Sequence, residues 1–570
     1  MIYRTEHPKP QFMRETWQNL NGPWQFEMDL SCSGKERNLF EAEQNFSQTI
    51  NVPFCVESDL SGIGYKDFVN SVWYKRDIEI TEAQLNGRVF LHFGAVDYIA
   101  DVYVNGTLVG THKGGYVSFK FEITEFVKAG KNVITVNATD NTRDRMIPTG
   151  KQSGKYASYG CYYTRTTGIW QTVWLEFTPK AYIECVKYTT DVDNATLNIT
   201  AELCGAGTFT AEATYEGKAV GSASVTTNGG FANVTLQLTE KHVWEVGCGR
   251  LYDLKLTYGE DTVASYFGLR SVRLEGNKFL INEKPVFQRL VLDQGFYPDG
   301  IYTAPSDAAL EKDIDLSMAV GFNGARLHEK VFEERFLYHC DRKGYIVWGE
   351  FPNWGLDHSY AESIYGFLPE WMEEVKRDMN HPAIIGWCPF NETWDKTFRK
   401  QYDDLLATVY KATKAIDPAR PCIDTSGNFH VLTDIYDLHD YEQNPEVFAE
   451  HQKPLGDTNV FEYRTAFQNR QQYDGKMPFF ISEYGGIRWT NDASGWGYGN
   501  GPKTEEEFLA RLKGLTDVLL DNPLMFGLCY TQLTDVEQEQ NGIYTYTREE
   551  KFPAEVIKAI FAREAAYEKQ

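Results

Sequence analysis

The sequence predicts a multidomain chain with an N-terminal jelly-roll β-sandwich, an immunoglobulin-like β-sandwich and a C-terminal (β/α)8 barrel, also called a TIM barrel. Three observations support this fold class. The 570 residues exceed what one hydrophobic core holds, so the chain must divide into domains. Residues 1–272 have the pattern of short alternating strands between turns. Residues 273–570 instead alternate short apolar runs with helical patterns.

Residues 1–181 are predicted to form the jelly-roll sandwich. Apolar and polar residues alternate in segments 71–80, 88–106 and 132–140, and Asn-Gly and Gly-Gly turns separate such segments. No convincing amphipathic helix interrupts them. About 180 residues of such strands suit a large sandwich of jelly-roll type.

Residues 182–272 are predicted to form a second, smaller sandwich. From here the strands become shorter and richer in Thr, Ala and Val. The clearest of them are 195–203, 209–217, 232–238 and 251–259. Short alternating strands at this spacing, within about 90 residues, are typical of an immunoglobulin-like sandwich.

Residues 273–570 contain eight short apolar runs, which is the strand count of a (β/α)8 barrel. The runs are 285–292, 321–328, 345–350, 384–392, 421–427, 433–441, 478–485 and 525–533. Most intervals between them carry a helical pattern. In 306–321, for example, Leu310, Ile314 and Met318 share one face behind a Ser-Asp start. The sixth interval is irregular and rich in aromatic residues.

Chemically active side chains gather at the predicted strand ends, where the active sites of such barrels lie. Two glutamates stand out, because Glu392 and Glu483 each end a nearly all-apolar run. Strands four and seven face each other across an eight-stranded barrel, so these two carboxyls can flank one sugar. Hydrolysis of a glycosidic bond uses such a pair, one protonated as acid and one ionised as nucleophile.

The stretch GWCPFNETW, residues 386–394, surrounds Glu392 with large aromatic side chains. A general acid needs a raised pKa to hold its proton at neutral pH, and apolar walls with a nearby anion raise it. We expect Trp387, Phe390 and Trp394 to form part of that wall. Asn391 is expected to donate to the sugar hydroxyl beside the reacting carbon.

The motifs GWCPFNETW and FFISEYGG, the latter residues 479–486, resemble the acid/base and nucleophile motifs of glycoside hydrolase family 2. That family includes β-galactosidases, β-glucuronidases and β-mannosidases. Further segments resemble its sugar-binding sandwich and its barrel strands two and three: 19–29, 72–80, 104–127, 165–176, 321–328 and 340–350. The resemblance covers nearly the whole chain.

The resemblance implies a retaining mechanism with Glu392 as acid/base and Glu483 as nucleophile. It also implies that Tyr441 hydrogen-bonds the nucleophile and that Arg326 orients it. The remaining candidates for the sugar pocket are Asp293, His328, Glu350, Trp354, His439, Tyr530 and Gln532. Packing at the barrel rim is the alternative for Trp354, His328, Tyr530 and Gln532, and an ion pair with Arg326 is the alternative for Glu350.

The positions that read the sugar depart from the family pattern. Glu329 stands where galactosidases and glucuronidases have a histidine, and Tyr162 where both have an aspartate. Segment 535–546 lacks the lysine of the Asn-x-Lys pair with which glucuronidases hold the sugar carboxylate. Capture of a carboxylate needs a cation, which Lys330 or Arg488 could provide.

No cofactor or metal is expected. Magnesium-dependent members of the family have their ligands just after strand three, where this chain has Trp354 and Leu356.

These observations predict a retaining exo-β-glycosidase of β-galactosidase-like type that acts on a small carbohydrate. A β-uronidase, for glucuronides or galacturonides, and an α-L-arabinosidase remain alternatives within the family. Two alternatives lie outside it: a non-catalytic carbohydrate-binding protein, and an unrelated barrel enzyme that uses His439 and Asp440 as a base.

Composition excludes other partners. The net charge of −24 argues against nucleic acid and anionic membrane surfaces, which attract clusters of Lys and Arg. No apolar run of about 18 residues is present, and the N-terminal segment lacks an apolar signal core. Ten cysteines without a C-x-x-C pair favour buried free thiols and a cytoplasmic location. The resemblance leaves a homo-oligomer open.

Overall fold

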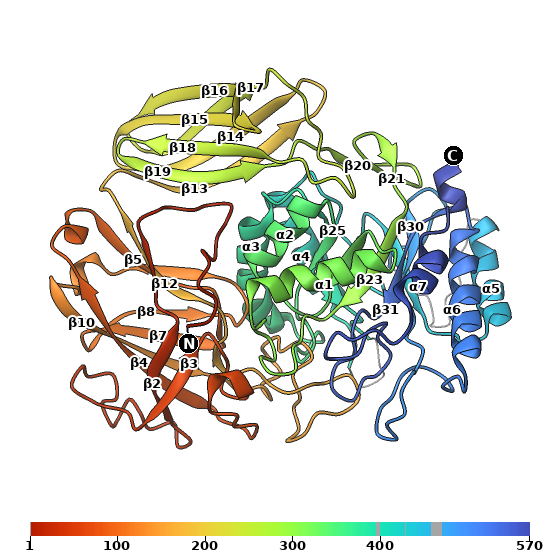
Figure 1. Cartoon of the computed structure of the whole chain (residues 1–570), viewed down its shortest axis with the longest axis horizontal. Helices are drawn as coiled ribbons and strands as arrows, with labels where there is room; N and C mark the ends of the chain where they lie inside the picture. Colours follow the sequence, from red (N-terminus) through yellow and green to blue (C-terminus); the bar gives the residue numbers. More distant parts are fainter. Residues whose placement is uncertain (1, 395–398, 428, 458–469, 570) are drawn as a thin grey trace.

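Two β-sandwiches and a barrel follow one another along the chain in a computed structural model (Figure 1). It describes residues 2–394, 399–427, 429–457 and 470–569. The first sandwich and the barrel lie side by side, and the second sandwich lies across one end of both (Figure 1). This arrangement confirms the predicted multidomain fold class.

The first sandwich consists of a six-stranded sheet, β3-β2-β4-β10-β7-β8, a four-stranded sheet, β1-β12-β5-β9, and the short pair β11-β6. Its strands are β1 Trp17–Asn19, β2 Gly22–Met28, β3 Gln48–Val52, β4 Ser71–Ile80, β5 Arg88–Phe93, β6 Val96–Asp97, β7 Ile99–Val104, β8 Thr107–Lys113, β9 Phe119–Glu122, β10 Gly130–Thr139, β11 Gly168–Ile169 and β12 Val173–Thr178. Apolar side chains from the two larger sheets form one core between them.

The second sandwich packs a three-stranded sheet, β13-β14-β17, against a four-stranded sheet, β16-β15-β18-β19. Its strands are β13 Tyr182–Asp191, β14 Thr196–Cys204, β15 Gly207–Tyr215, β16 Lys218–Thr227, β17 Gly230–Gln237, β18 Tyr252–Tyr258 and β19 Asp261–Phe267. Buried and exposed residues alternate along them, as they do in β17, because each sheet has one core face and one solvent face. The predicted boundary at residue 182 coincides with the start of β13.

A small sheet, β20-β21-β22, leads into the barrel. The strands from here on are β20 Val272–Glu275, β21 Lys278–Ile281, β22 Lys284–Pro285, β23 Gln288–Asp293, β24 Gly324–Leu327, β25 Ile346–Glu350, β26 Ile384–Cys388, β27 Phe390–Asn391, β28 Thr425–Ser426, β29 Tyr436–Asp440, β30 Phe479–Gly485 and β31 Met525–Thr531. Barrel strands pair in parallel in the order β26-β25-β24-β23-β31-β30-β29, and the parallel pair β27-β28 continues from β26 toward β29. Each of the eight predicted runs coincides with one of these strands, except that the fourth run contains both β26 and β27 and that β23 ends one residue beyond the first run.

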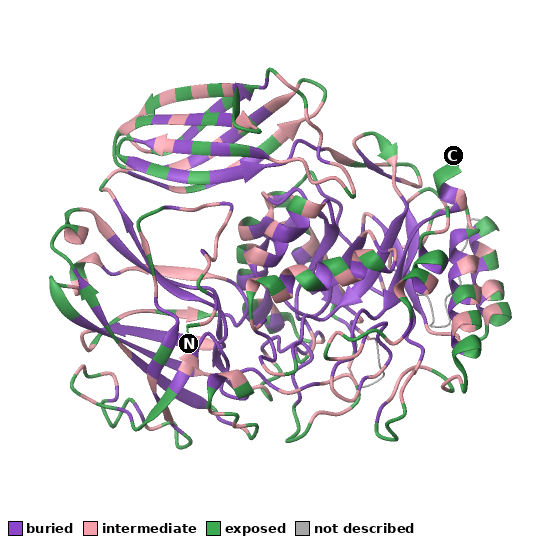
Figure 2. Ribbon diagram, in the orientation of Figure 1, coloured by how far each residue is buried: buried purple, intermediate pink, exposed green. Residues whose placement is uncertain are grey.

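Helices cover the outside of the barrel and expose their outer faces, whereas its strands are buried (Figure 2). They are α1 Asp307–Ala319, α2 Glu334–Lys343, α3 Ile364–Asp378, α4 Asp403–Ile416, α5 Pro445–Gln452, α6 Glu505–Leu520 and α7 Ala554–Phe561. Short 3-10 turns lie at Asp59–Ser61, Gln84–Asn86, Thr124–Phe126, Ala361–Ser363, Lys453–Asp457 and Ala566–Lys569. The predicted helix over 306–321 is confirmed as α1, which Ser306 caps by accepting from the N–H of Ala309.

The sixth interval, predicted to be irregular, contains α5. Asn444 caps this helix by accepting from the N–H groups of Glu446 and Val447, and Pro445 occupies its first position. The prediction was therefore wrong for the first part of the interval. Residues 458–469 of the same interval lie outside the described ranges.

Two findings bear on the expectations from composition. No helix within the described ranges combines the length and the apolarity that crossing a bilayer needs. The ten cysteines are free thiols, but only five of them are buried.

A loop of the first sandwich reaches the ends of the barrel strands. The N–H of Thr149 donates to the carbonyl of Trp354 at 2.8 Å, and the N–H of Gly150 donates to that of Pro352 at 3.1 Å. Gly150 has a φ of +58°, and a Cβ there would lie 2.7 Å from the backbone oxygen of Glu329. The two backbones therefore approach as closely as a glycine allows.

Replacing Gly150 should therefore weaken the junction between sandwich and barrel. We predict that Gly150→Ala destabilises the protein by about 1–3 kcal/mol, from backbone strain and steric overlap, and lowers the midpoint of thermal unfolding. Gly154→Ala is the matched control, because a Cβ at Gly154 meets nothing within 4 Å. Equal midpoints for the two variants would show that the close approach does not contribute to stability.

Candidate active site

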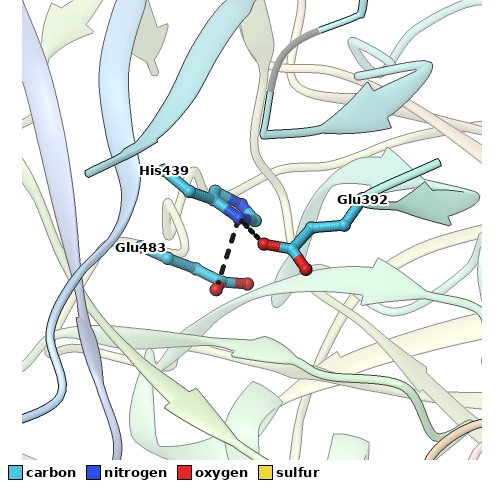
Figure 3. A group of neighbouring side chains, drawn as sticks. All are labelled: Glu392, His439 and Glu483. Atoms are coloured by element: carbon cyan, nitrogen blue, oxygen red, sulfur yellow. Dashed lines mark hydrogen bonds and ion pairs between the residues drawn. The ribbon is translucent and has the colours of Figure 1, made fainter. Parts of the chain in front are cut away.

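Two glutamates lie close together at the carboxyl ends of the barrel strands (Figure 3). Glu392 directly follows β27, and Glu483 lies in β30. His439 on β29 lies between them, its Nδ1 atom 2.8 Å from Glu392 Oε1 and 3.3 Å from Glu483 Oε2. Atoms of the three side chains all lie within 4.8 Å of one another. Such a short distance is expected for the retaining geometry, in which the two carboxyls lie about 5 Å apart.

Arg326 on β24 holds one of these glutamates in place. Its Nη1 donates to Glu483 Oε1 at 3.1 Å and to the carbonyl of Ser482 at 2.8 Å. Its Nη2 donates to Asn391 Oδ1 at 3.1 Å, and its Nε donates to Glu350. Burial alone would lower the pKa of Arg326, but the carboxylates of Glu350 and Glu483 raise it well above its ordinary value. The guanidinium is therefore a permanent charge beside Glu483.

Glu350 and His328 form a second layer around this arginine. His328 Nδ1 lies 3.3 Å from Glu350 Oε2 and 3.9 Å from Glu483 Oε1. Burial raises the pKa of Glu350 to about 7, with Glu483 adding to the effect and Arg326 opposing it. Burial and the charges of Lys151, Arg326 and His439 lower the pKa of His328 well below its ordinary value. His328 is therefore neutral at physiological pH, and Glu350 is an ion-pair partner of Arg326.

Tyr441 binds the second oxygen of Glu483. Its hydroxyl donates to Glu483 Oε2 at 2.6 Å and lies 2.9 Å from Thr531 Oγ1. The Tyr441 ring stacks on Tyr498, with ring centroids 3.5 Å apart. The contact expected from the resemblance is thus present, and both oxygens of Glu483 are oriented from opposite sides.

Asn391 has a free donor beside the two glutamates. Its backbone oxygen accepts from Asn353 Nδ2 at 3.0 Å and from Trp354 Nε1 at 3.2 Å, and its Oδ1 accepts from Arg326. Its buried Nδ2 has no hydrogen-bond partner among the described residues. A buried donor in this position needs a ligand to satisfy it, and a sugar hydroxyl would do so.

The surroundings of Glu392 differ from the predicted aromatic wall. Trp387 packs against Trp371 of α3, and Phe390 stacks on Phe367 of the same helix. Both rings therefore point outward from the barrel, and the prediction was wrong for them. Trp394 does line a cavity of about 200 Å³ together with Glu392. Its other lining residues include Tyr162, Trp354, Thr393 and Arg399.

Two predicted pocket residues lie elsewhere. Asp293 accepts from the N–H of Gly295 at 2.9 Å, and burial together with the charge of Asp313 on α1 raises its pKa to about 7. Tyr530 packs edge-on against Phe561 of α7. Both side chains face the helices rather than the interior of the barrel, so these two predictions were wrong.

Gln532 stays at the strand ends but does not contact the glutamates. Its Oε1 accepts from Gln294, and its Nε2 donates to Asn541 Oδ1 at 2.8 Å. Gln294 also donates to the hydroxyl of Tyr163 at 2.8 Å, which connects this network to the loop of the first sandwich.

The unrelated mechanism based on His439 and Asp440 lacks its geometry. Asp440 accepts from His451 Nδ1 at 2.9 Å and from Gln452 Nε2 at 3.1 Å, both on α5. His439 points to the opposite side, toward the glutamates. The two side chains therefore do not form a catalytic pair.

Several residues at the site were missed from the sequence. They are Lys151, Asn353, Tyr498 and Thr531. Thr531 directly precedes the predicted Gln532, so its place at a strand end was a usable signal. Tyr498 and Lys151 come from loops, and no periodic pattern marks them.

Comparison with known proteins agrees with this fold and site. The family model described as "Glycosyl hydrolases family 2, sugar binding domain" matches residues 17–179, and the TIM barrel domain model of that family matches residues 272–495. The β-glucuronidase of Felis catus is 29% identical over 477 residues, which cover 74% of this chain and 69% of the relative. The β-glucuronidase of Paenibacillus borealis is 23% identical over 615 residues, which cover 98% of this chain and 99% of the relative.

Solved structures have the same fold. The β-glucuronidase of Lactobacillus rhamnosus aligns with a TM-score of 0.82 at 19% identity, over 99% of this chain and 100% of that one. The β-glucuronidase of an uncultured Clostridium sp. aligns with a TM-score of 0.79 at 22% identity, over 96% of this chain and 98% of that one. The protein is thus a glycoside hydrolase. It belongs to glycoside hydrolase family 2.

Glu392, His439 and Glu483 are also residue types that bind metals. Hydrolysis by two carboxyl groups needs no metal, because one carboxylate attacks the sugar and the other carboxyl group transfers a proton. We predict that cleavage of an aryl β-glycoside continues at an unchanged rate after dialysis against EDTA. A loss of activity that zinc or magnesium restores, and that buffer alone does not, would assign the three side chains to a metal.

Proposed function

We propose that this enzyme is a retaining exo-β-glycosidase that hydrolyses β-D-glucuronides. The observation that carries the catalytic part is the pair of carboxyls, Glu392 and Glu483, whose oxygens approach within 4.8 Å. The names of the relatives support the sugar, since the two described above, which align over 74% and 98% of this chain, are β-glucuronidases. They favour the β-uronidase alternative over the β-galactosidase-like type that the sequence predicts.

In the first step Glu483 attacks the anomeric carbon. Arg326 and Tyr441 each bind one of its oxygens, so the carboxylate is fixed before the substrate arrives. Glu392 protonates the glycosidic oxygen, and the aglycone leaves as an alcohol. Asn391 Nδ2 donates to the 2-hydroxyl, a contact that strengthens in the transition state. A glycosyl ester of Glu483 results.

In the second step Glu392, now ionised, accepts a proton from water, and the water attacks the anomeric carbon. The bond to Glu483 breaks, and the free sugar leaves with its original β configuration. His439 Nδ1 lies within 3.3 Å of both carboxyls, so we assign it the role of orienting the pair during this exchange of roles.

Removal of the acid should affect substrates according to their leaving groups. We predict that Glu392→Ala slows cleavage of an alkyl β-glucuronide by several orders of magnitude, because an alkoxide leaves poorly without a proton. A dinitrophenyl glucuronide needs no protonation, so its glycosyl-enzyme should form and accumulate. Azide needs no base and should restore turnover as the β-glucuronosyl azide, detected by NMR.

The variant Glu483→Gln tests the nucleophile. It should lose nearly all turnover with every leaving group, because the nucleophile itself is gone. An α-configured azide product from Glu392→Ala would show that Glu392 is the nucleophile and Glu483 the acid/base. If all substrates were impaired equally and azide did not restore turnover, Glu392 would only shape the sugar pocket.

A panel of 4-nitrophenyl glycosides tests the sugar. We predict that kcat/KM for the β-D-glucuronide exceeds that for the β-D-galactoside, β-D-glucoside, β-D-mannoside and α-L-arabinoside by at least about a hundredfold. A neutral sugar lacks the carboxylate, so the group of the enzyme that binds this carboxylate would be left unpaired. The β-D-galacturonide differs from the glucuronide only in the orientation of its 4-hydroxyl, so comparing the two shows whether the enzyme distinguishes that orientation. The highest kcat/KM for a neutral sugar would contradict the proposal.

A further inference from the structure

Lys151 is a buried cation that has no direct partner in the part of the chain that the structure describes. It lies on the loop by which the first sandwich reaches the barrel, and only 5% of its surface is exposed. Its Nζ lies 5.2 Å from the ring centroid of Trp354. The ammonium forms no hydrogen bond or ion pair with any residue of the described ranges. A buried charge of this kind is costly unless a ligand of opposite charge completes the site.

The charge of Lys151 acts on the catalytic residues. Burial alone would lower its pKa, but the carboxylates of Glu539 and Glu483 raise it above its ordinary value. Its charge in turn lowers the pKa of His328, after burial the largest cause of that shift. The ammonium therefore remains protonated and lies within electrostatic reach of the nucleophile.

Backbone contacts fix the position of this lysine. The residues before it, Thr149 and Gly150, donate to the carbonyls of Trp354 and Pro352 after β25. Its own carbonyl accepts from the N–H of Tyr163 at 2.7 Å. Lys151 is thus held by the sandwich on one side and by the barrel on the other.

The other candidate cations are engaged elsewhere. Lys330 donates to the carbonyls of Gly295 and Tyr302 at 2.6 and 2.8 Å. Arg488 donates to the carbonyl of Asp492 at 3.1 Å. Arg399 pairs with Asp357 at 2.9 Å, and Arg326 is surrounded by the partners described above.

Glu329 adds a second unsatisfied group. It is buried, its Oε2 accepts from the N–H of Trp354 at 3.0 Å, and its Oε1 has no partner among the described residues. Burial raises its pKa well above the ordinary value, although Lys151 and the N–H of Trp354 oppose the shift. A protonated Glu329 can donate to a ligand and would not repel an anion.

We propose that Lys151 binds the carboxylate of the substrate, so that the first sandwich, rather than the loop after β31, selects uronides. This inference rests on the proposed function. It explains how a β-glucuronidase can lack a lysine in 535–546. The ion pair forms in a buried place, where charge-assisted hydrogen bonds are strong.

The test compares two substrates that differ only at C6: 4-nitrophenyl β-D-glucuronide and β-D-glucoside. Lys151→Met removes the charge and keeps most of the length. It should lower the ratio of kcat/KM for the glucuronide to that for the glucoside by about 100- to 1000-fold, the effect of losing one partner of a buried charge pair. Lys151→Arg should recover part of the glucuronide rate.

Lys155→Met is the matched control, since this exposed lysine of the same loop stacks on Tyr159, 3.8 Å from its ring centroid. Calorimetry adds a readout independent of turnover. Lys151→Met should weaken binding of uronic isofagomine by a similar factor and binding of neutral isofagomine little.

The outcomes separate this inference from the proposed function. An active wild-type uronidase whose Lys151→Met variant keeps its glucuronide-to-glucoside ratio would overturn the role of Lys151 alone. Equal losses with both substrates and both inhibitors would show that Lys151 only balances the charge of Glu539. A wild-type enzyme without uronidase activity would overturn the proposed function together with this inference.

Discussion

The buried guanidinium of Arg326 is the interaction on which the catalytic end of the barrel depends. It binds groups from the three strands β25, β27 and β30, in addition to its own β24. Removing it would leave Glu350 and Glu483 buried beside each other without a cation, which is strongly unfavourable. One positive charge therefore aligns the strand ends and the nucleophile at once. Asn391 and Tyr441 then complete the positions around Glu483.

The division of work between the domains follows from this arrangement. The barrel supplies the two carboxyls and the groups that orient them, which are common to hydrolysis of any β-linked sugar. The loop of the first sandwich approaches through Gly150 and contributes Lys151 and Tyr163. With the role proposed for Lys151, sugar selection falls to the first sandwich and the chemistry to the barrel, and the junction at Gly150 holds the two together.

The sequence predicted the architecture and the glutamate pair because both follow from topology: strand ends of a barrel meet at one face. It misplaced Asp293, Tyr530, Trp387 and Phe390 for one shared physical reason. Parallel barrel strands are buried on both faces, so alternation in the sequence does not distinguish inward from outward side chains. Lys151 was missed because it is about 240 residues from Glu392 in the chain, and only packing of the sandwich on the barrel brings it near. Neither hydrophobic periodicity nor motif spacing carries that information.

Trapping the covalent intermediate tests the central claim most directly. 2-Deoxy-2-fluoro-β-D-glucuronosyl fluoride forms the glycosyl ester quickly, because fluoride leaves readily, and the fluorine at C2 slows its hydrolysis. After digestion, mass spectrometry should find the fluoro-glucuronosyl group on the peptide that contains Glu483, and on that residue. A label on Glu392 or His439, or an unlabelled enzyme that still hydrolyses glucuronides, would contradict the account.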